Sequence, residues 1–217
     1  MTTLSSYIRD TRSLLNDTRS TRFTDIDYTI ALNRARRKLV MDTLCTRKTV
    51  TFSSAAGVSS YDFWGANTSS SPTVLFSAFD IYLCQYLQGN VYQNLIRAAP
   101  NQFLVIQGQN TSNQGTPLWY SVGGGVNQSL FLYPIPSSVN TVRCNIVYYP
   151  ADFLIGATVD GAQAENDIRQ EWADCVPYLA ASFLKEIYQA YDDAQQLEAL
   201  YQRRIRAVGS SVMRMRG

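Results

Sequence analysis

The sequence contains no histidine among its 217 residues. Every Ser-His or Cys-His nucleophile pair and every imidazole metal site is therefore excluded, which removes most classes of hydrolase. The four cysteines lie 39, 60 and 31 residues apart and form no C-x-x-C pair, so their spacing does not indicate a metal site either. They are Cys45, Cys84, Cys144 and Cys175. We expect reduced, buried thiols, no bound metal and no cofactor.

Long hydrophobic runs are also missing. No apolar stretch approaches the 18 or more residues of a membrane span. The first six residues, Met1 to Ser6, have neither the basic region nor the apolar region of a secretory signal. The sequence therefore predicts a soluble protein without membrane contact.

Charge is scarce in the middle of the chain, although the formal net charge of the whole is only +2. Residues 1 to 48 contain ten Lys or Arg and five Asp, whereas residues 49 to 168 contain two Arg and six acids. The pattern indicates a basic helical start, a weakly charged middle rich in Ser, Thr, Asn, Gln, Gly and Tyr, and a helical end with a basic tip.

The stretch from Glu165 to Val208 has the apolar spacing of an amphipathic helix that organises the fold. Its stripe consists of Val176, Ala180, Phe183, Ile187, Ala190, Ala194, Leu197, Tyr201, Ile205 and Val208. Asp174 as N-cap and Pro177 in the first turn place the helix start near Cys175, and Gly209 places its end after Val208. The run Tyr191-Asp192-Asp193 permits a break, which leaves one bent helix or two stacked helices. Replacing Phe183 or Ile187 with Ala is expected to destabilise the fold by about 2–5 kcal/mol.

Helices are also predicted at the N-terminus, from Leu4 to Asn16 and from Thr24 to Cys45. Thr24 and Asp27 have the spacing of a capping box at the start of the second helix. From Lys48 the apolar period changes to two, which predicts a hairpin through Val50 and Tyr61. The ranges 118–122, 130–133 and 141–149 are predicted to form a three-stranded antiparallel meander.

These elements predict an α+β fold: an N-terminal helix pair and long C-terminal helices packed as a bundle, with a β-rich antiparallel middle. The expected divisions are the N-terminal helices at 1–47, the β-rich insertion at 48–164, the C-terminal helices at 165–208 and a flexible docking tail at 209–217.

Two groups of charged residues are candidate sites. Arg34, Arg36, Arg37 and Lys38 form a cluster that either contacts phosphates or is a solvated helix face complemented by neighbouring acids. Carboxylate pairs such as Glu165 with Asp167, or Asp192 with Asp193, are weak catalytic candidates, because acids that open a helix are already favoured by its dipole. We therefore do not expect an enzyme.

Several apolar and aromatic motifs resemble those of the adaptor proteins of tailed bacteriophages, also called head-to-tail joining or connector proteins. The motifs are Trp119-Tyr120, Leu130-Phe131-Leu132-Tyr133-Pro134-Ile135-Pro136, Val147-Tyr148-Tyr149-Pro150-Ala151-Asp152-Phe153-Leu154 and Gln170-Glu171-Trp172, with the helices Tyr7 to Asp17 and Asp25 to Leu44. The resemblance spans nearly the whole chain.

This resemblance implies a non-enzymatic ring, commonly of twelve copies, in the virion at the head–tail junction. Its partners would be the portal protein, a tail nozzle or tail tube protein and further copies of itself. Genome DNA would pass through its channel without sequence-specific binding. Synthesis would take place in the bacterial host cytoplasm.

The last residues, Ser210 to Gly217, contain two Arg and no acid. They are too few to bury a core, so we expect them to be disordered in isolation. The alternation of Val212, Met213, Arg214, Met215 and Arg216 suits an extended segment that docks on a partner, and the resemblance implies that this partner is the portal.

Two other classes of function remain open from the sequence. The first is a nucleic-acid-binding module that uses the face from Arg34 to Lys38, for which steep salt dependence of duplex binding is expected. The second is a carboxylate-based glycan hydrolase, for which turnover would depend on Glu165 or Glu171.

Overall fold

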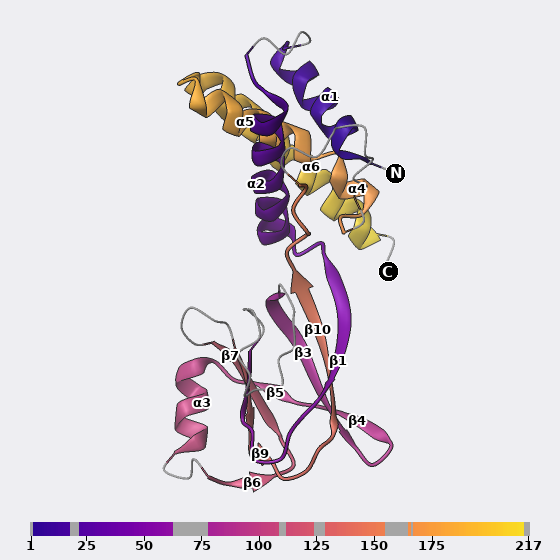
Figure 1. Cartoon of the computed structure of the whole chain (residues 1–217), viewed down its shortest axis with the longest axis vertical. Helices are drawn as coiled ribbons and strands as arrows, with labels where there is room; N and C mark the ends of the chain where they lie inside the picture. Colours follow the sequence, from indigo (N-terminus) through magenta and orange to yellow (C-terminus); the bar gives the residue numbers. More distant parts are fainter. Residues whose placement is uncertain are drawn as a thin grey trace. The chain divides into compact units, whose positions relative to one another are not determined.

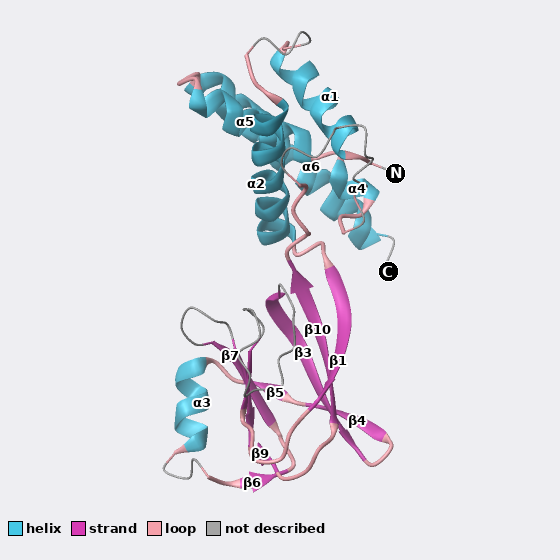
Figure 2. Ribbon diagram, in the orientation of Figure 1, coloured by secondary structure: helices cyan, strands magenta, loops and turns pink. Residues whose placement is uncertain are grey.

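The computed structural model describes residues 2–17, 22–62, 78–108, 112–123, 129–154, 165 and 167–214. The chain divides into two compact units (Figure 1). One comprises Met1–Thr46 with Pro150–Gly217 and is called the helical unit; the other comprises Arg47–Tyr149 and is called the strand unit. Figure 2 shows that the strands of both larger sheets belong to the second unit, which contains a single helix within its described residues. The predicted α+β class is confirmed.

The helical unit contains α1 (Leu4–Leu15), α2 (Asp25–Thr43), α4 (Gln170–Ala173), α5 (Val176–Ile187) and α6 (Tyr191–Arg214). The predicted capping box opens α2: the Thr24 side chain accepts a hydrogen bond from the Asp27 N–H, and the Asp27 carboxylate accepts one from the Thr24 N–H. Thr3 and Ser6 form an equivalent box at the start of α1. Both N-terminal helices therefore begin where their polar residues satisfy the first backbone donors.

The C-terminal region forms two helices, which resolves the alternatives left by the sequence. The chain leaves α5 at Ile187, and Gln189 adopts a left-handed conformation with φ of 57° before α6 begins. Asp192 and Asp193 lie in the first turn of α6, where the helix dipole favours negative charge. Lys185 donates to the Asp193 carboxylate over 2.7 Å and links the two helices across the break.

The predicted helix end at Val208 is wrong, because α6 continues to Arg214. Gly209 lies inside this helix, and a side chain built there would meet the Trp172 ring of α4 at 3.9 Å. A glycine inside a helix costs only about 1 kcal/mol relative to alanine. Ile205 and Val208, in the turn before Gly209, pack against the core.

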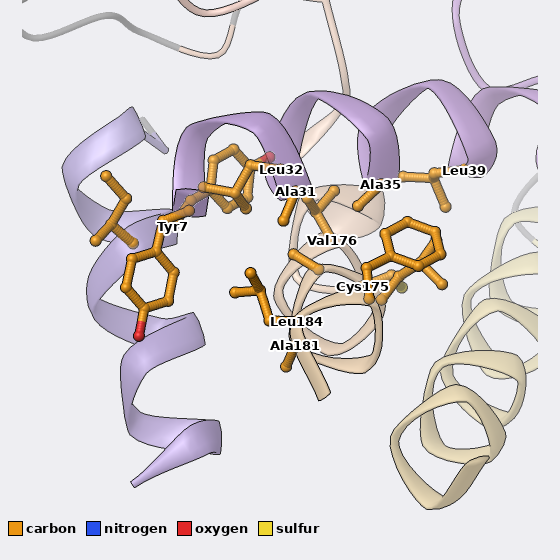
Figure 3. Packing of buried hydrophobic residues seen from close by; sticks show 14 of the residues in the cluster. Tyr7, Ala31, Leu32, Ala35, Leu39, Cys175, Val176, Ala181 and Leu184 are labelled. Carbon is orange, nitrogen blue, oxygen red and sulfur yellow. The ribbon is translucent and has the colours of Figure 1, made fainter. Parts of the chain in front are cut away.

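The core of the helical unit is built around α5, which packs against α1, α2 and α6. Figure 3 shows Leu32 and Leu39 of α2 on one side of Val176 and Leu184, with Tyr7 of α1 close by. Of the predicted stripe, Val176, Ala180 and Tyr201 are fully buried. The inclusion of Ile187 is wrong, because its side chain is 70% exposed at the last residue of α5.

On α5 we therefore expect a large loss of stability when Leu184 is replaced and a small one when Ile187 is replaced. Leu184→Ala should lower the free energy of unfolding by about 2–5 kcal/mol, since it removes a fully buried side chain and leaves a cavity. Ile187→Ala on the same helix should change it by less than about 0.5 kcal/mol. Urea titration followed by helical circular dichroism measures both, and equal effects of the two substitutions would contradict this packing.

The strand unit contains two four-stranded sheets. The first has the order β1-β10-β3-β4, and all its neighbours are antiparallel. Its strands are β1 (Arg47–Ser53), β10 (Thr141–Tyr148), β3 (Ala78–Gln88) and β4 (Val91–Asn94). The second has the order β2-β8-β7-β5, from β2 (Ser60–Asp62), β8 (Ser129–Tyr133), β7 (Trp119–Gly123) and β5 (Ile96–Arg97), with β5 parallel to β7. Inward residues of both sheets, among them Ile81, Tyr120, Leu132 and Val142, form one core.

A second, smaller core lies between the second sheet and α3 (Pro100–Gln107). Phe103 of α3 makes ring contacts with Phe131 and Tyr133 of β8. Pro100 occupies the first turn of α3, where its missing N–H group leaves no hydrogen bond unmade.

Two predicted strand pairings are wrong. The strands β1 and β2 do not pair as a hairpin, because β1 pairs with β10 and β2 with β8. The meander is correct only for β7 with β8, since β10 belongs to the other sheet. Between β8 and β10 the segment β9 (Ile135–Pro136) pairs with β6 (Gln114–Gly115), so the chain leaves the second sheet before β10 begins.

Candidate functional site

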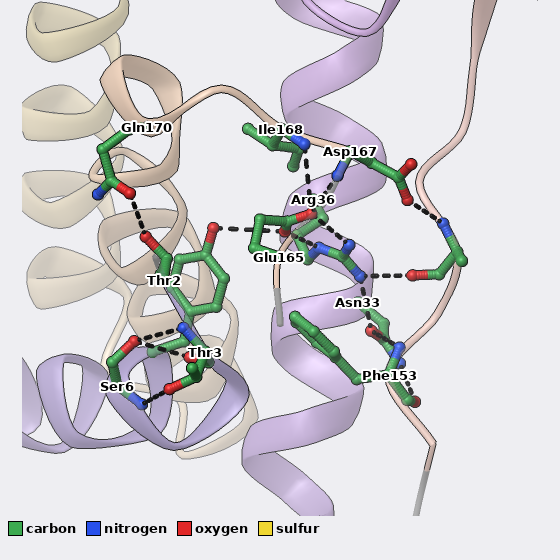
Figure 4. A network of polar contacts seen from close by, with 12 residues as sticks. Thr2, Thr3, Ser6, Asn33, Arg36, Phe153, Glu165, Asp167, Ile168 and Gln170 are labelled. Atoms are coloured by element: carbon green, nitrogen blue, oxygen red, sulfur yellow. Dashed lines mark hydrogen bonds and ion pairs between the residues drawn. The ribbon is translucent and has the colours of Figure 1, made fainter. Parts of the chain in front are cut away.

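The predicted basic cluster on α2 is divided by the fold. Arg36 turns inward and forms an ion pair with Glu165, whose side chain is 1% exposed while that of Arg36 is 2% exposed. The guanidinium Nε donates to Oε2 over 2.6 Å and Nη2 donates to Oε1 over 2.9 Å, which is the two-pronged geometry of a strong pair (Figure 4). Arg36 is therefore not available to a phosphate, and its place in the predicted phosphate-contact face is corrected.

Further donors complete the surroundings of Glu165. The backbone N–H groups of Asp167 and Ile168 donate to its Oε1 at 3.1 and 3.2 Å, and the Tyr7 hydroxyl donates to Oε2 at 3.4 Å. Burial, together with the Glu165 charge, raises the pKa of Tyr7 well above the ordinary tyrosine value. Both oxygens of Glu165 are thus engaged in structural contacts, and the Asp167 carboxylate accepts a hydrogen bond from the Ala151 N–H over 2.9 Å.

The same network fixes the segment by which the chain returns to the helical unit. The Asn33 side chain donates to the Phe153 carbonyl over 3.0 Å and accepts from the Phe153 N–H over 2.9 Å. Arg36 Nη1 donates to the Ala151 carbonyl over 2.7 Å, and its guanidinium carbon lies 4.0 Å from the centre of the Phe153 ring. Every contact joins α2 to a segment more than a hundred residues away in sequence.

The remaining basic residues of α2 stay at the surface with different partners. Arg37 forms an ion pair with Asp152, and Lys38 lies 3.8 Å from the Asp42 carboxylate one turn later. Arg34 stacks over the Phe183 ring with its guanidinium carbon 4.2 Å from the ring centre. The alternative of a solvated face complemented by acids fits Arg37 and Lys38.

Next to these residues lies an open hollow of about 690 Å³ in the helical unit. Its lining includes Ile30, Arg34, Met41, Phe183, Glu186 and Glu198. Ile30 and Met41 are about half exposed. Hydrophobic and charged side chains of both signs therefore meet at one surface of α2, α5 and α6.

Three of the five predicted docking residues, Val212, Met213 and Arg214, lie at the end of α6. Met215 and Arg216 are outside the described residues, and the structure describes only the helical backbone of Val212, Met213 and Arg214. Residues 210–214 thus continue a helix, whereas the sequence predicted disorder from Ser210 onward.

The described residues hold no group of three His, Cys, Asp or Glu side chains placed to bind a metal. In the same part of the chain, no helix combines the length and the apolar character needed to cross a membrane. Asp193 is paired with Lys185, so the Asp192–Asp193 candidate has one carboxylate in use. Glu171 lies exposed in the first turn of α4.

Sequence reasoning missed the partner of Arg36 and the roles of Asn33 and Phe153. Glu165 is 129 residues from Arg36, and no local spacing links them. A partial signal was present: Glu165 is one of only six acids between residues 49 and 168.

The fold defines an α+β protein in which a helical unit is interrupted by an inserted strand unit and in which the buried charges hold the chain together. From residue 2 to residue 217 the sequence matches the family model of the SU10 adaptor protein, and the chain belongs to this family. The resemblance to phage adaptor proteins is thereby confirmed, and the family name describes a structural role. Among curated proteins, no sequence matches this chain.

Proposed function

We propose that this protein is the virion adaptor that joins the portal vertex of the capsid to the tail. The observation that carries the proposal is membership of the adaptor family over nearly the whole chain. Twelve copies form a ring at the head–tail junction, and the genome passes through its centre without sequence-specific binding. The portal protein is the partner on one side and a tail nozzle or tail tube protein is the partner on the other.

Two features of the molecule support such a role. Each unit has its own hydrophobic core, so each can present a partner surface without unfolding the other. The described part of the helical unit also exposes large hydrophobic side chains, among them Ile26, Ile30 and Met41 of α2. Side chains of this kind on a surface are typical of contacts with other proteins.

We assign portal docking to the C-terminal residues Val212, Met213, Arg214, Met215 and Arg216. Adaptable Met side chains suit an apolar groove, and Arg suits partner carboxylates. Arg34, Arg37 and Lys38 are assigned to the channel as phosphate contacts, without Arg36. The ion pairs of Arg37 and Lys38 weaken their attraction for phosphate, which suits transient contacts with passing DNA better than a dedicated nucleic-acid-binding module.

Removal of residues 212–217 is expected to weaken capture by the portal at least tenfold, or about 1.4 kcal/mol. The melting temperature should stay nearly unchanged, because Val208 is the last of the described side chains of α6 that packs on the core, and the deletion begins four residues later. Surface plasmon resonance on immobilised portal, with thermal melting in parallel, measures both quantities.

The matched control is Arg203→Ala combined with Arg206→Ala. This variant also removes two positive charges, at positions of α6 that precede the docking residues. It should retain portal affinity. Equal affinity of the full-length and truncated proteins would remove the docking assignment from the C-terminus.

A further inference from the structure

Two cysteines of the strand unit face each other across neighbouring strands. Cys84 of β3 and Cys144 of β10 are directly opposite in the antiparallel register, and their Sγ atoms lie 3.6 Å apart. Both side chains are completely buried in the core between the two sheets. Both are free thiols in the structure.

The backbone shows which kind of antiparallel pair they form. Within a strand, the N–H and C=O of one residue point toward the same neighbouring strand, and the carbonyl of Cys84 accepts from the Leu95 N–H over 2.9 Å. Leu95 directly follows β4, so the Cys84 backbone faces away from β10. Cys84 and Cys144 are therefore a non-hydrogen-bonded pair, in which the Cα atoms lie about 4.5 Å apart and the side chains approach most closely.

This spacing is within the range that a disulfide requires, about 4.4–6.8 Å between Cα atoms. No backbone movement between β3 and β10 is needed to bring the two sulfur atoms together. β10 and β3 are also the two inner strands of their sheet, so a bond between them would link the centre of the strand unit.

We propose that Cys84 and Cys144 are a disulfide site, oxidised by a low-molecular-weight disulfide such as oxidised glutathione. One Cys thiolate attacks the glutathione disulfide and releases one glutathione thiolate, which leaves a mixed disulfide on the protein. The second Cys thiolate then attacks the protein sulfur of the mixed disulfide and releases the second glutathione. Two protein thiols lose two protons and two electrons, and one oxidised glutathione becomes two reduced molecules.

Burial determines when this exchange takes place. The contact with the Cys144 thiol, followed by burial, raises the pKa of Cys84, so few thiolates form in the closed core. Exchange therefore proceeds while β3 and β10 are open, during folding or local unfolding. Once formed, the bond is shielded from reductants by the same core.

The proposed disulfide between Cys84 and Cys144 does not depend on the proposed function. Its role in the virion does. A virion protein is made in a reducing cytoplasm and then persists outside the cell, where disulfides are stable. The bond would form after synthesis and stabilise the strand unit in the released particle.

The test is refolding of the full-length chain in glutathione buffers of increasing oxidised fraction, followed by alkylation in denaturant, where every free thiol is accessible, and intact mass measurement. The number of alkylated cysteines should fall from four to two, and peptide mapping should link Cys84 to Cys144. The oxidised protein should melt at least about 5 °C higher than the reduced protein, because the bond closes a long loop. Unfolding the oxidised protein in reductant and refolding it in reductant should reverse the shift.

Cys45 and Cys175 are controls within the same chain and should remain alkylated. Cys84→Ala should abolish the disulfide and the melting shift, while Cys45→Ala should retain both. If Cys84→Ala does not fold, peptide mapping of the unsubstituted protein still shows whether Cys84 and Cys144 are linked. Four alkylated cysteines in a natively refolded protein at the most oxidising ratio, or a bond between other cysteines, would overturn the proposal.

Discussion

Glu165→Ala is expected to lower the free energy of unfolding of the helical unit by about 3–5 kcal/mol. The substitution removes the only ion-pair partner that the described residues provide for Arg36, whose side chain is 2% exposed. Without Glu165 the Arg36 guanidinium would be a charge buried away from water with no counter-charge, which is energetically unfavourable. The acceptor for the Tyr7 hydroxyl and for two backbone N–H groups is lost as well. Urea titration followed by helical circular dichroism gives the change.

Asp152→Ala is the matched control, because Asp152 pairs with the neighbouring residue Arg37 at the surface. Both members of that pair are about half exposed, so its loss should cost no more than about 1 kcal/mol. The double variant Arg36→Met with Glu165→Leu should recover most of the stability, since it leaves no buried charge unpaired. If Glu165→Ala and Asp152→Ala lower the free energy of unfolding by the same amount, the buried network does not hold the segment around Ala151 and Phe153 on α2.

Raising the pH above about 10 is expected to unfold the helical unit, because three buried tyrosines must stay protonated in the fold. Each donates a hydrogen bond to a carboxylate: Tyr7 to Glu165, Tyr28 to Asp17 over 2.9 Å and Tyr201 to Asp42 over 2.8 Å. Burial, followed by the neighbouring carboxylate, raises the pKa of each above the ordinary value of 10.0. Above pH 10 the unfolded chain releases protons that the folded state retains. The stability contributed by these groups is therefore complete below pH 10 and lost as the pH rises above it.

Each of the three tyrosines should contribute a loss of about 1.4 kcal/mol per pH unit between pH 10 and its folded-state pKa. Tyr201→Phe should reduce the slope of stability against pH by about one third, although it also removes the hydrogen bond to Asp42. Tyr191→Phe is the control, because Tyr191 is 60% exposed in the same unit. Urea titrations at a series of pH values give the slopes. If Tyr201→Phe leaves the slope unchanged, the buried tyrosines do not cause the loss of stability at high pH.

The helical unit was largely predictable because its signals are local. The Thr24–Asp27 capping box and the apolar spacing of Val176, Ala180 and Tyr201 each depend on residues within a few turns. The spacing could not show where α5 ends, so it included Ile187, which follows the period but lies beyond the packed part of the helix. The end of α6 was also missed, because a glycine weakens a helix without having to end it.

Strand partners were less predictable, because alternation shows which face of a strand is buried and says nothing about its neighbour. Val142, Cys144 and Ile146 alternate as expected, yet β10 pairs with β1 and β3 rather than with β8. The β9 segment after β8 determines this change of sheet.

The candidate site shows the same limit more sharply. Arg34, Arg36, Arg37 and Lys38 are equivalent in a charge count, and only the distant Glu165 distinguishes the buried Arg36 from its neighbours. A basic helical stretch therefore indicated where charge lies along the chain, while tertiary contacts determined which charges face solvent.

Native mass spectrometry of the protein, alone and mixed with the portal of the same phage, tests the adaptor function most directly. Alone, the protein should be a folded monomer, since each unit has its own core and ring contacts are individually weak. With portal, it should appear in a complex that carries twelve adaptor copies on the portal ring. Portal and folded monomer that remain separate at every protein and salt concentration would contradict the account.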